Sequence, residues 1–141
     1  MVKVNIKPQF NMSVIKDHFK NFRDSIDDKA ILVLIELADK SAIDLRQNAD
    51  FMNHTFNLRS SLGAVVFRNG MIVHENFEAV SGGSDGLEKG KQVAQSNIPS
   101  TGLGMMLVAG EDYALYVEAR DNKWVISGSS MRLAKLLQNL I

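Results

Sequence analysis

The sequence contains no cysteine, only two prolines and a single tryptophan among its 141 residues. A chain without cysteine forms neither a disulfide framework nor a thiolate metal site. No apolar run approaches the roughly 20 residues that a membrane-spanning helix needs. The first residues also lack the apolar block and the small-residue cleavage site of a signal peptide. The sequence therefore predicts a protein made in the cytosol, with no membrane partner.

An excess of charge of either sign is also missing. Sixteen basic residues balance sixteen acidic ones. The balance is local as well, because residues 1–60 carry nine basic and eight acidic groups and residues 61–141 carry seven and eight. A protein that binds nucleic acid presents a basic stripe to the phosphates, and none is visible in the sequence. The charge pattern argues against nucleic acid as a partner.

The composition that remains is that of an ordinary globular protein, with 45% apolar and 23% charged residues. At this length we expect one domain over residues 1–141, burying about two-thirds of the surface of the unfolded chain. Residues 1–11 alternate apolar and polar side chains and suggest an N-terminal strand or arm. Residues 12–50 read as a helical region, capped by Ser13, with a possible break at residues 25–28. Its first part carries one apolar stripe, formed by Ile15, Phe19, Phe22 and Ile26.

After residue 57 the spacing of apolar residues changes from a helical to an alternating pattern. Residues 57–79 predict a hairpin, because Asn69-Gly70 is the preferred pair for a type I′ turn. Residues 80–100 are rich in glycine and serine and read as an exposed, mobile loop with at most one helical turn. Residues 101–141 predict strand, helix, strand and helix, with strands over 103–109 and 124–126. The fold class is therefore α+β: a long N-terminal helical region on an antiparallel sheet of about four strands, helices on one face, and a C-terminal helix.

Catalytic and metal-binding signatures are weak. Gly86 to Gln92 resembles a phosphate-binding loop only faintly, since the glycine spacing and the residue after the lysine are wrong. The three histidines have no partner at helical spacing, so we expect no metal site. Serines near turns are typical of caps, and the acidic pairs Asp27-Asp28 and Glu111-Asp112 suit helix starts. We predict no catalytic residue, no cofactor and no enzyme activity.

Two short segments are more informative. Residues 57–63 read Asn-Leu-Arg-Ser-Ser-Leu-Gly and place Arg59 at a helix-to-strand junction, where its planar group can hold carbonyls or a carboxylate. Residues 113–118 read Tyr-Ala-Leu-Tyr-Val-Glu and place Tyr113 and Tyr116 on one side of a short helix, beside Glu118. The purely structural interpretation is an arginine that closes a loop and a helix that packs on the sheet. The alternative is an interface, where tyrosine is enriched.

Together these segments resemble the neck, or tail-completion, proteins of long-tailed bacteriophages, also described as head-tail joining or minor capsid components. The resemblance covers most of residues 12–141 and rests on residues 57–62, 113–118 and the pattern at 124–140. Phe56 stands where that family usually has a glycine, and Ala119-Arg120 where a glycine is common.

The resemblance implies a structural subunit of the virion, made in the bacterial cytoplasm. It would form a ring, with six copies as the expected number, between the portal or connector and the tail tube or tail terminator. Nucleic acid would meet it only as genome passing through the ring.

We predict that the subunit contact involves residues 80–100 and 113–118, together with Arg59. The candidate residues are Arg59, Gly82, Gly83, Asp85, Tyr113, Tyr116 and Glu118. Deleting residues 82–91 should then abolish assembly and spare the melting temperature of the monomer.

Two alternatives from other classes remain open. The first is a small cytosolic ligand-binding or regulatory α+β domain acting as a dimer. The second is an enzyme, favoured only if folding brings a histidine beside a carboxylate and a serine.

Overall fold

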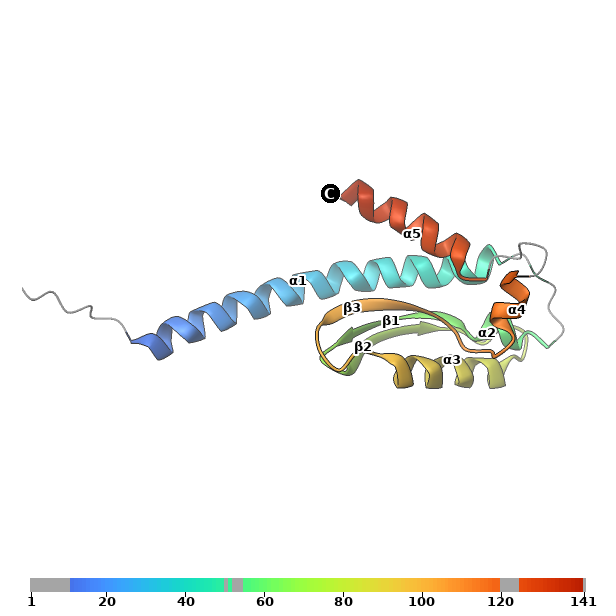
Figure 1. The fold of residues 1–141 in the computed structure, drawn as a ribbon, viewed down its shortest axis with the longest axis horizontal. Coiled ribbons are helices and arrows are strands. Elements are labelled where there is room, and N and C mark those ends of the chain that lie inside the picture. The colour runs from blue at the N-terminus through green and yellow to red at the C-terminus, as the bar shows by residue number, and fades with distance from the viewer. Residues whose placement is uncertain (1–10, 50, 52–54, 120–124, 141) are drawn as a thin grey trace, which may run out of the picture. The chain divides into compact units, whose positions relative to one another are not determined.

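The computed structural model describes residues 11–49, 51, 55–119 and 125–140. The chain divides into two compact units, Met1–Ala30 and Ile31–Ile141. The described elements, labelled in Figure 1, are α1 (Met12–Gln47), α2 (Asn57–Ser60), β1 (Leu62–Arg68), β2 (Met71–Phe77), α3 (Ser84–Asn97), β3 (Leu103–Ala109), α4 (Ala114–Ala119) and α5 (Ser127–Leu140). The α+β class predicted from the sequence is confirmed.

Helix α1 begins one turn earlier than its first apolar stripe residue. The side-chain Oδ1 of Asn11 accepts hydrogen bonds from the backbone N–H and the hydroxyl of Ser13, at 3.0 and 2.8 Å. Asn11 is therefore the N-cap, and not Ser13 as the sequence suggested. The helix continues without interruption to Gln47, so the predicted break at residues 25–28 is absent. The acidic pair there lies within the helix instead of opening a new one.

The sheet has three antiparallel strands in the order β2-β1-β3. β1 and β2 form the predicted hairpin, and its turn residues Asn69 and Gly70 have φ angles of 49° and 80°. Both positions are left-handed, as a type I′ turn requires. A β-bulge lies between the pairs Val66↔His74 and Phe67↔Ile72. The predicted fourth strand is not formed in the described residues, since Val125 and Ile126 lie in a bend that leads directly into α5. The strand expected in residues 1–11 falls outside the described residues, apart from Asn11.

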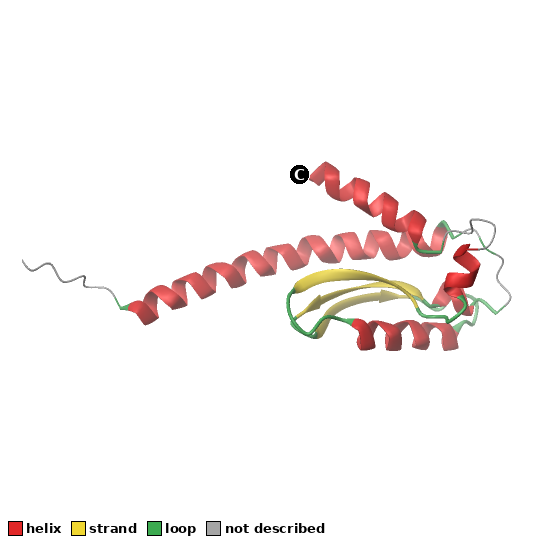
Figure 2. Ribbon diagram, viewed as in Figure 1, coloured by secondary structure: helices red, strands yellow, loops and turns green. Residues whose placement is uncertain are grey.

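Helices cover both faces of the sheet, which corrects the expectation of one covered face. Ala64 and Val66 of β1 pack against Ala38 and Ala42 of α1. On the other face, Val65 packs with two residues of α3 and β3, Ala94 and Val108. The sheet therefore lies between the C-terminal part of α1 and helix α3, as Figure 2 shows. The side chains of β1 alternate between these two faces, and all but the last residue of the strand are buried.

Helix α3 replaces most of the loop predicted for residues 80–100. That prediction is wrong because the glycines of this segment serve packing rather than flexibility. Ideal Cβ atoms at Gly86 and Gly90 would overlap backbone atoms of Asn57 and Ser61. Small residues allow this close approach of a helix to its neighbours, at a cost of about 1 kcal/mol in helix propensity for each glycine. The glycine-rich composition of residues 80–100, which is typical of a loop, is therefore found here in a tightly packed helix.

A third cluster closes one end of the sheet. It contains buried side chains from α1, α2, β1, α4 and the segments before α2 and α5. They are Leu45, Phe51, Leu58, Leu62, Ala114 and Val125. Helix α5 is fixed to α1 by Arg132, whose guanidinium contacts both carboxylate oxygens of Asp44 at distances of 2.7 to 3.0 Å. The C-terminal helix predicted from the leucine stripe is thus present and begins at Ser127.

Candidate functional site

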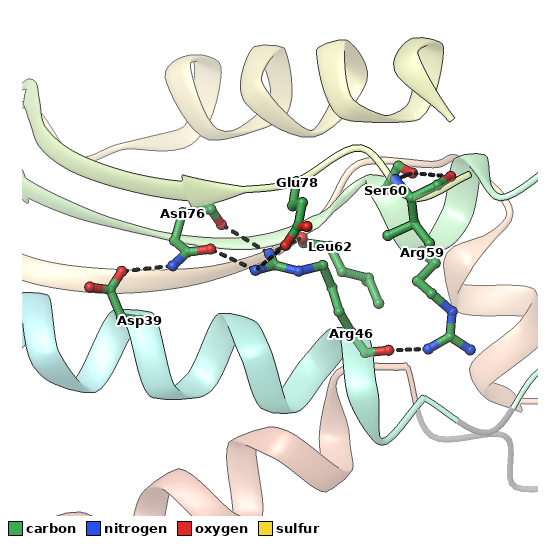
Figure 3. Close-up of polar contacts among 8 residues, drawn as sticks. Asp39, Arg46, Arg59, Ser60, Leu62, Asn76 and Glu78 are labelled. Carbon is green, nitrogen blue, oxygen red and sulfur yellow. Dashed lines mark hydrogen bonds and ion pairs between the residues drawn. The ribbon is translucent and has the colours of Figure 1, made fainter. Parts of the chain in front are cut away.

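A row of polar side chains joins the C-terminal part of α1 to the edge strand β2 (Figure 3). Arg46 is its centre and is only 7% exposed. Its guanidinium donates to Oδ1 of Asn76 at 2.7 Å and, at longer range, to the backbone carbonyls of Asn76 and Leu62, at 3.4 and 3.3 Å. Burial lowers the pKa of the Arg46 guanidinium, and the carboxylates of Glu78 and Asp39 oppose that shift. The arginine remains charged, since its ordinary pKa lies far above neutrality.

Asp39 extends the row by one step. Its Oδ1 lies 2.8 Å from Nε2 of His74 and accepts a hydrogen bond of 2.8 Å from the side-chain amide of Asn76. Burial by itself would raise the pKa of this carboxyl, but the hydrogen bonds from Asn76 and His74 outweigh it and hold the pKa below its ordinary value. Asn76 therefore connects a carboxylate on one side to a guanidinium on the other.

This row was missed in the sequence, although its spacing carried a signal. Asp39 and Arg46 are seven residues apart, which places them on one face of α1 two turns from each other. His74 and Asn76 alternate on β2 and share one face of the sheet. Neither pair suggests a contact until the hairpin and the helix are known to face each other. The row also brings a histidine beside a carboxylate, but no serine hydroxyl among the described residues hydrogen-bonds His74.

Arg59 closes the end of α1. Its guanidinium donates to the backbone carbonyl of Arg46 in the last turn and, at 3.1 Å, to the carbonyl of Ala49 just beyond the helix. It also lies 5.1 Å from the centre of the Phe51 ring, within cation–π range. Such contacts compensate the unpaired carbonyls and the negative end of the helix dipole. The loop-closing interpretation of Arg59 therefore accounts for these contacts.

The residue before α2 has a strained backbone conformation. Phe56 has a φ of 61° and a ψ of 5°, a left-handed conformation that favours glycine. A bulky side chain there costs on the order of 1–3 kcal/mol of strain. A glycine at this position would adopt the same turn freely.

A shallow groove of about 240 Å³ lies beside the polar row. It is lined by Ile43, Arg46, Gln47, Arg59, Glu78 and Val80. Both of its arginines already donate hydrogen bonds to protein carbonyls, so they act as structural cross-links. Glu78 lies 3.8 Å from Arg46 with a largely exposed side chain. The groove is therefore lined by two arginines that are engaged in hydrogen bonds and by one exposed carboxylate.

The three interface candidates predicted in the loop of residues 80–100 are Gly82, Gly83 and Asp85, and they lie at the start of α3. Gly82 has a φ of 89° and forms the turn before the helix. A Cβ on Gly83 would overlap Ser60 and Phe56, so this glycine is part of the contact with α2. Asp85 lies exposed in the first turn of α3, where a carboxylate is favourable. Because residues 82–91 contain this packed helix start, their deletion would disturb the fold, contrary to our expectation of an unchanged melting temperature.

The tyrosine segment forms α4, one residue later than its first tyrosine. Tyr113 is 45% exposed. Burial, and then the Glu111 carboxylate, raise the pKa of its hydroxyl. The side chain of Tyr116 lies outside the described part of the chain. Glu118 accepts hydrogen bonds from the backbone N–H groups of Ile126 and Ser127, at 3.4 and 3.1 Å. This carboxylate therefore caps the start of α5.

Glu111 has a role that the sequence did not predict. Instead of capping α4 with its carboxylate, this buried side chain accepts a hydrogen bond of 2.9 Å from Nζ of Lys89 in α3. The hydrogen bond and the charge of Glu111 raise the pKa of Lys89. Both lysines of the glycine-rich stretch are thus paired with carboxylates of their own chain, because Lys91 lies 3.0 Å from Glu75.

Apolar side chains are exposed along the first part of α1. Met12, Phe19, Phe22 and Ile26 are between 51% and 68% exposed, and Ile15 is half-buried. These residues include the stripe predicted from the sequence. They lie in one continuous helix, as predicted, but this face is not part of any core cluster among the described residues. An exposed apolar face of this kind typically marks an interaction surface.

Within the described residues, no three histidine or acidic side chains lie close enough together to hold a metal ion. No described helix has the length and apolar character to cross a membrane. Comparisons with protein-family models, with curated proteins and with solved structures found no match to this chain.

Proposed function

We propose that this protein is a non-enzymatic assembly subunit whose copies associate with one another. The observation that carries this proposal is the exposed apolar face of α1 between Met12 and Ile26. Leaving apolar surface in water costs about 25 cal/mol for each Å². Four large side chains exposed by half or more on one face of a helix therefore provide a driving force for association.

The resemblance to phage neck proteins suggests which assembly this is. It supports a ring between the portal or connector and the tail tube, in a phage or a prophage. A net charge of zero is compatible with such a role, because it removes long-range repulsion between copies. Head-to-tail contacts between identical subunits close into a ring when the rotation between neighbours suits. Residues 80–100 and 113–118, together with Arg59, remain the predicted contacts.

The alternative is a small ligand-binding or regulatory domain acting as a dimer. It is favoured by the groove of about 240 Å³ beside Arg46 and Arg59. A small anion would suit the two arginines that line this groove, although Glu78 opposes it by charge.

Light scattering and negative-stain imaging of the full chain over a concentration series separate these proposals. Closed rings would support the neck subunit. A tight dimer that persists on dilution would support the regulatory domain. A monomer at every concentration up to about 1 mM, where only associations weaker than roughly 4 kcal/mol escape detection, would contradict self-assembly.

A further inference from the structure

We propose that the outer edge of β3 binds residues 2–6 of a neighbouring copy as a fourth strand of the sheet, so that main-chain hydrogen bonds join the two subunits. This inference rests on the assembly role proposed above and identifies a contact for it. Two observations carry it. The first is the unprotected edge of β3, and the second is the sequence before α1 together with its point of attachment.

β3 presents a regular apolar edge. It is an outer strand, because the order of the sheet is β2-β1-β3. Its residues 103–109 include neither a charged side chain nor proline, and they pair with β1 without a bulge. In an antiparallel ladder every second residue directs its N–H and C=O away from the neighbouring strand. Apart from the ladder with β1, the described residues form no backbone hydrogen bond with residues 103–109. The outward groups of β3 are therefore available to another strand.

The opposite edge of the sheet is protected in ways that β3 is not. The bulge in the hairpin makes Val73 an extra residue of β2. The same strand carries Glu75, whose carboxylate lies 3.0 Å from Nζ of Lys91. Bulges and charged side chains keep edge strands from pairing with other chains. β3 is instead apolar toward both layers, since Met105 packs with the cluster on α1 and Met106 with the cluster on α3.

The sequence before α1 suits this edge. Three β-branched residues alternate there with three polar residues, until Pro8 ends the pattern; they are Val2, Val4 and Ile6, and Lys3, Asn5 and Lys7. In a strand the apolar members would share one face, where they extend an apolar face of β3. Strand addition of this kind takes its affinity from main-chain hydrogen bonds and its specificity from alternate side chains.

The attachment of this segment to α1 indicates that the strand comes from another copy. Residues 7–11 span at most about 18 Å when extended. Met12 and Leu34 are about 33 Å apart along the axis of α1. Leu34 packs against the same core cluster as Met105 of β3. The connection is therefore too short for residues 2–6 to lie along β3 of their own copy. Each copy gives a strand to one neighbour and accepts a strand from another, and such head-to-tail contacts can close into a ring.

Disulfide cross-linking tests this contact, because the chain has no cysteine of its own. Val4→Cys copies with an added mass tag are mixed in turn with Leu103→Cys, Met105→Cys, Met106→Cys and Leu107→Cys copies and oxidised mildly. We expect covalent pairs of one tagged and one untagged copy, since adjacent strands lie within disulfide range. Successive side chains of a strand point to opposite faces, so cross-links should form either with Met106 or with the other three positions, but not with both sets. No cross-link at any of the four positions would overturn the inference.

Two further variants control this experiment. Val73→Cys is exposed on the protected edge strand β2 and should not cross-link to Val4→Cys. The second combines Val4→Cys with the reactive position of β3 in one chain, and we expect it to give covalent multimers. A monomer closed by an internal disulfide would place residues 2–6 on their own copy and would contradict the contact between copies.

Proline substitutions test the main-chain hydrogen bonds. Neighbouring residues of a strand direct their N–H groups to opposite sides, so only one of Val4 and Asn5 donates to β3. Of Val4→Pro and Asn5→Pro, one should weaken association in sedimentation equilibrium by at least about 10-fold, and by more than the other does. Lys3→Ala keeps the backbone donor and should leave association within about 2-fold. If both proline variants associate like the wild type, the inference is wrong and the assembly role stands. If the wild-type chain is monomeric at every concentration, the assembly role is contradicted, and the contact with it.

Discussion

Helix α1 contains two regions with the same periodicity and different surroundings. In residues 12–30 the large apolar side chains of Met12, Phe19, Phe22 and Ile26 are exposed. In residues 31–47 an apolar face is buried: Leu37, Ala38, Ala42 and Leu45 are each at most 6% exposed. Ala38 and Ala42 pack on the sheet, and Leu45 lies in the cluster at its end. One uninterrupted helix thus carries both a core face and a free face.

The difference lies in residue size and polar neighbours. The buried region uses alanine where the helix packs against β1, and it adds Asp39 and Arg46, whose hydrogen bonds reach Asn76 of β2. The exposed region uses phenylalanine and isoleucine, with lysine and arginine on one flank. Periodicity therefore predicts that a helix has an apolar face, whereas side-chain size and polar pairing indicate whether its own chain covers that face.

The largest expected loss of stability comes from a substitution in the buried region of α1. Leu45→Ala removes a side chain that is 1% exposed and should destabilise the protein by about 3 kcal/mol, by lost transfer energy and an unfilled cavity. Phe19→Ala, in the exposed region, should change the free energy of unfolding by less than about 0.5 kcal/mol. Urea unfolding at a concentration where copies are dissociated measures both. Equal losses would mean that residues 12–30 are also covered by their own chain.

A second test concerns helix α3, on the other face of the sheet. Gly86→Ala improves helix propensity by about 1 kcal/mol but places a Cβ against the backbone of Asn57. Overpacking against backbone should prevail and give a net loss of about 2 kcal/mol in urea unfolding. Gln92→Ala, exposed in the same helix, is the control and should change stability by less than about 0.5 kcal/mol. A stabilised Gly86→Ala variant would contradict the close packing of α3.

Buried and exposed charges on α1 should also differ. Arg46→Met removes the donor to the side-chain Oδ1 and backbone carbonyl of Asn76 and to the backbone carbonyl of Leu62. We expect a loss of about 1.5 kcal/mol by chemical denaturation. Lys40→Met breaks the exposed pair with Glu36, at 2.7 Å, and should leave the stability nearly unchanged, because solvent screens the pair. If the two variants lose the same stability, the polar row has no special role in joining α1 to β2.

Much of the fold could be predicted because its signals are local. The hairpin follows from Asn69-Gly70, the last helix from its leucine stripe, and the long helix from the spacing of its apolar residues. Helix α3 could not be predicted, since glycine at residues 83, 86 and 90 normally indicates a loop, and its function here depends on the backbone of α2 and β1. The layer on the second face of the sheet was missed for the same reason.

The candidate site was less accessible to sequence reasoning. Arg59 was identified correctly as a residue at a junction, and its carbonyl partners were among the interpretations considered. Glu118 was selected for its neighbours, yet it caps a helix that begins nine residues later. The row from His74 to Arg46 joins segments about 30 residues apart, so no local motif marks it. Long-range polar contacts of this kind become visible only when the register of the hairpin against α1 is known.

The smallest effect should come from Asp39, at the outer end of that row. Its folded pKa lies below its ordinary value of 3.8, so its contribution to stability is present above the unfolded pKa and is lost as the pH falls through the folded pKa. Asp39→Asn should therefore destabilise the protein by about 0.5 kcal/mol at neutral pH, because the side chain is partly exposed, and by less near pH 2.5. Urea unfolding of Asp39→Asn, His74→Ala and the double variant gives the coupling between the two side chains at each pH. A coupling that is as large in acid as at neutral pH would show that the ionised carboxylate is not what holds this edge strand to α1.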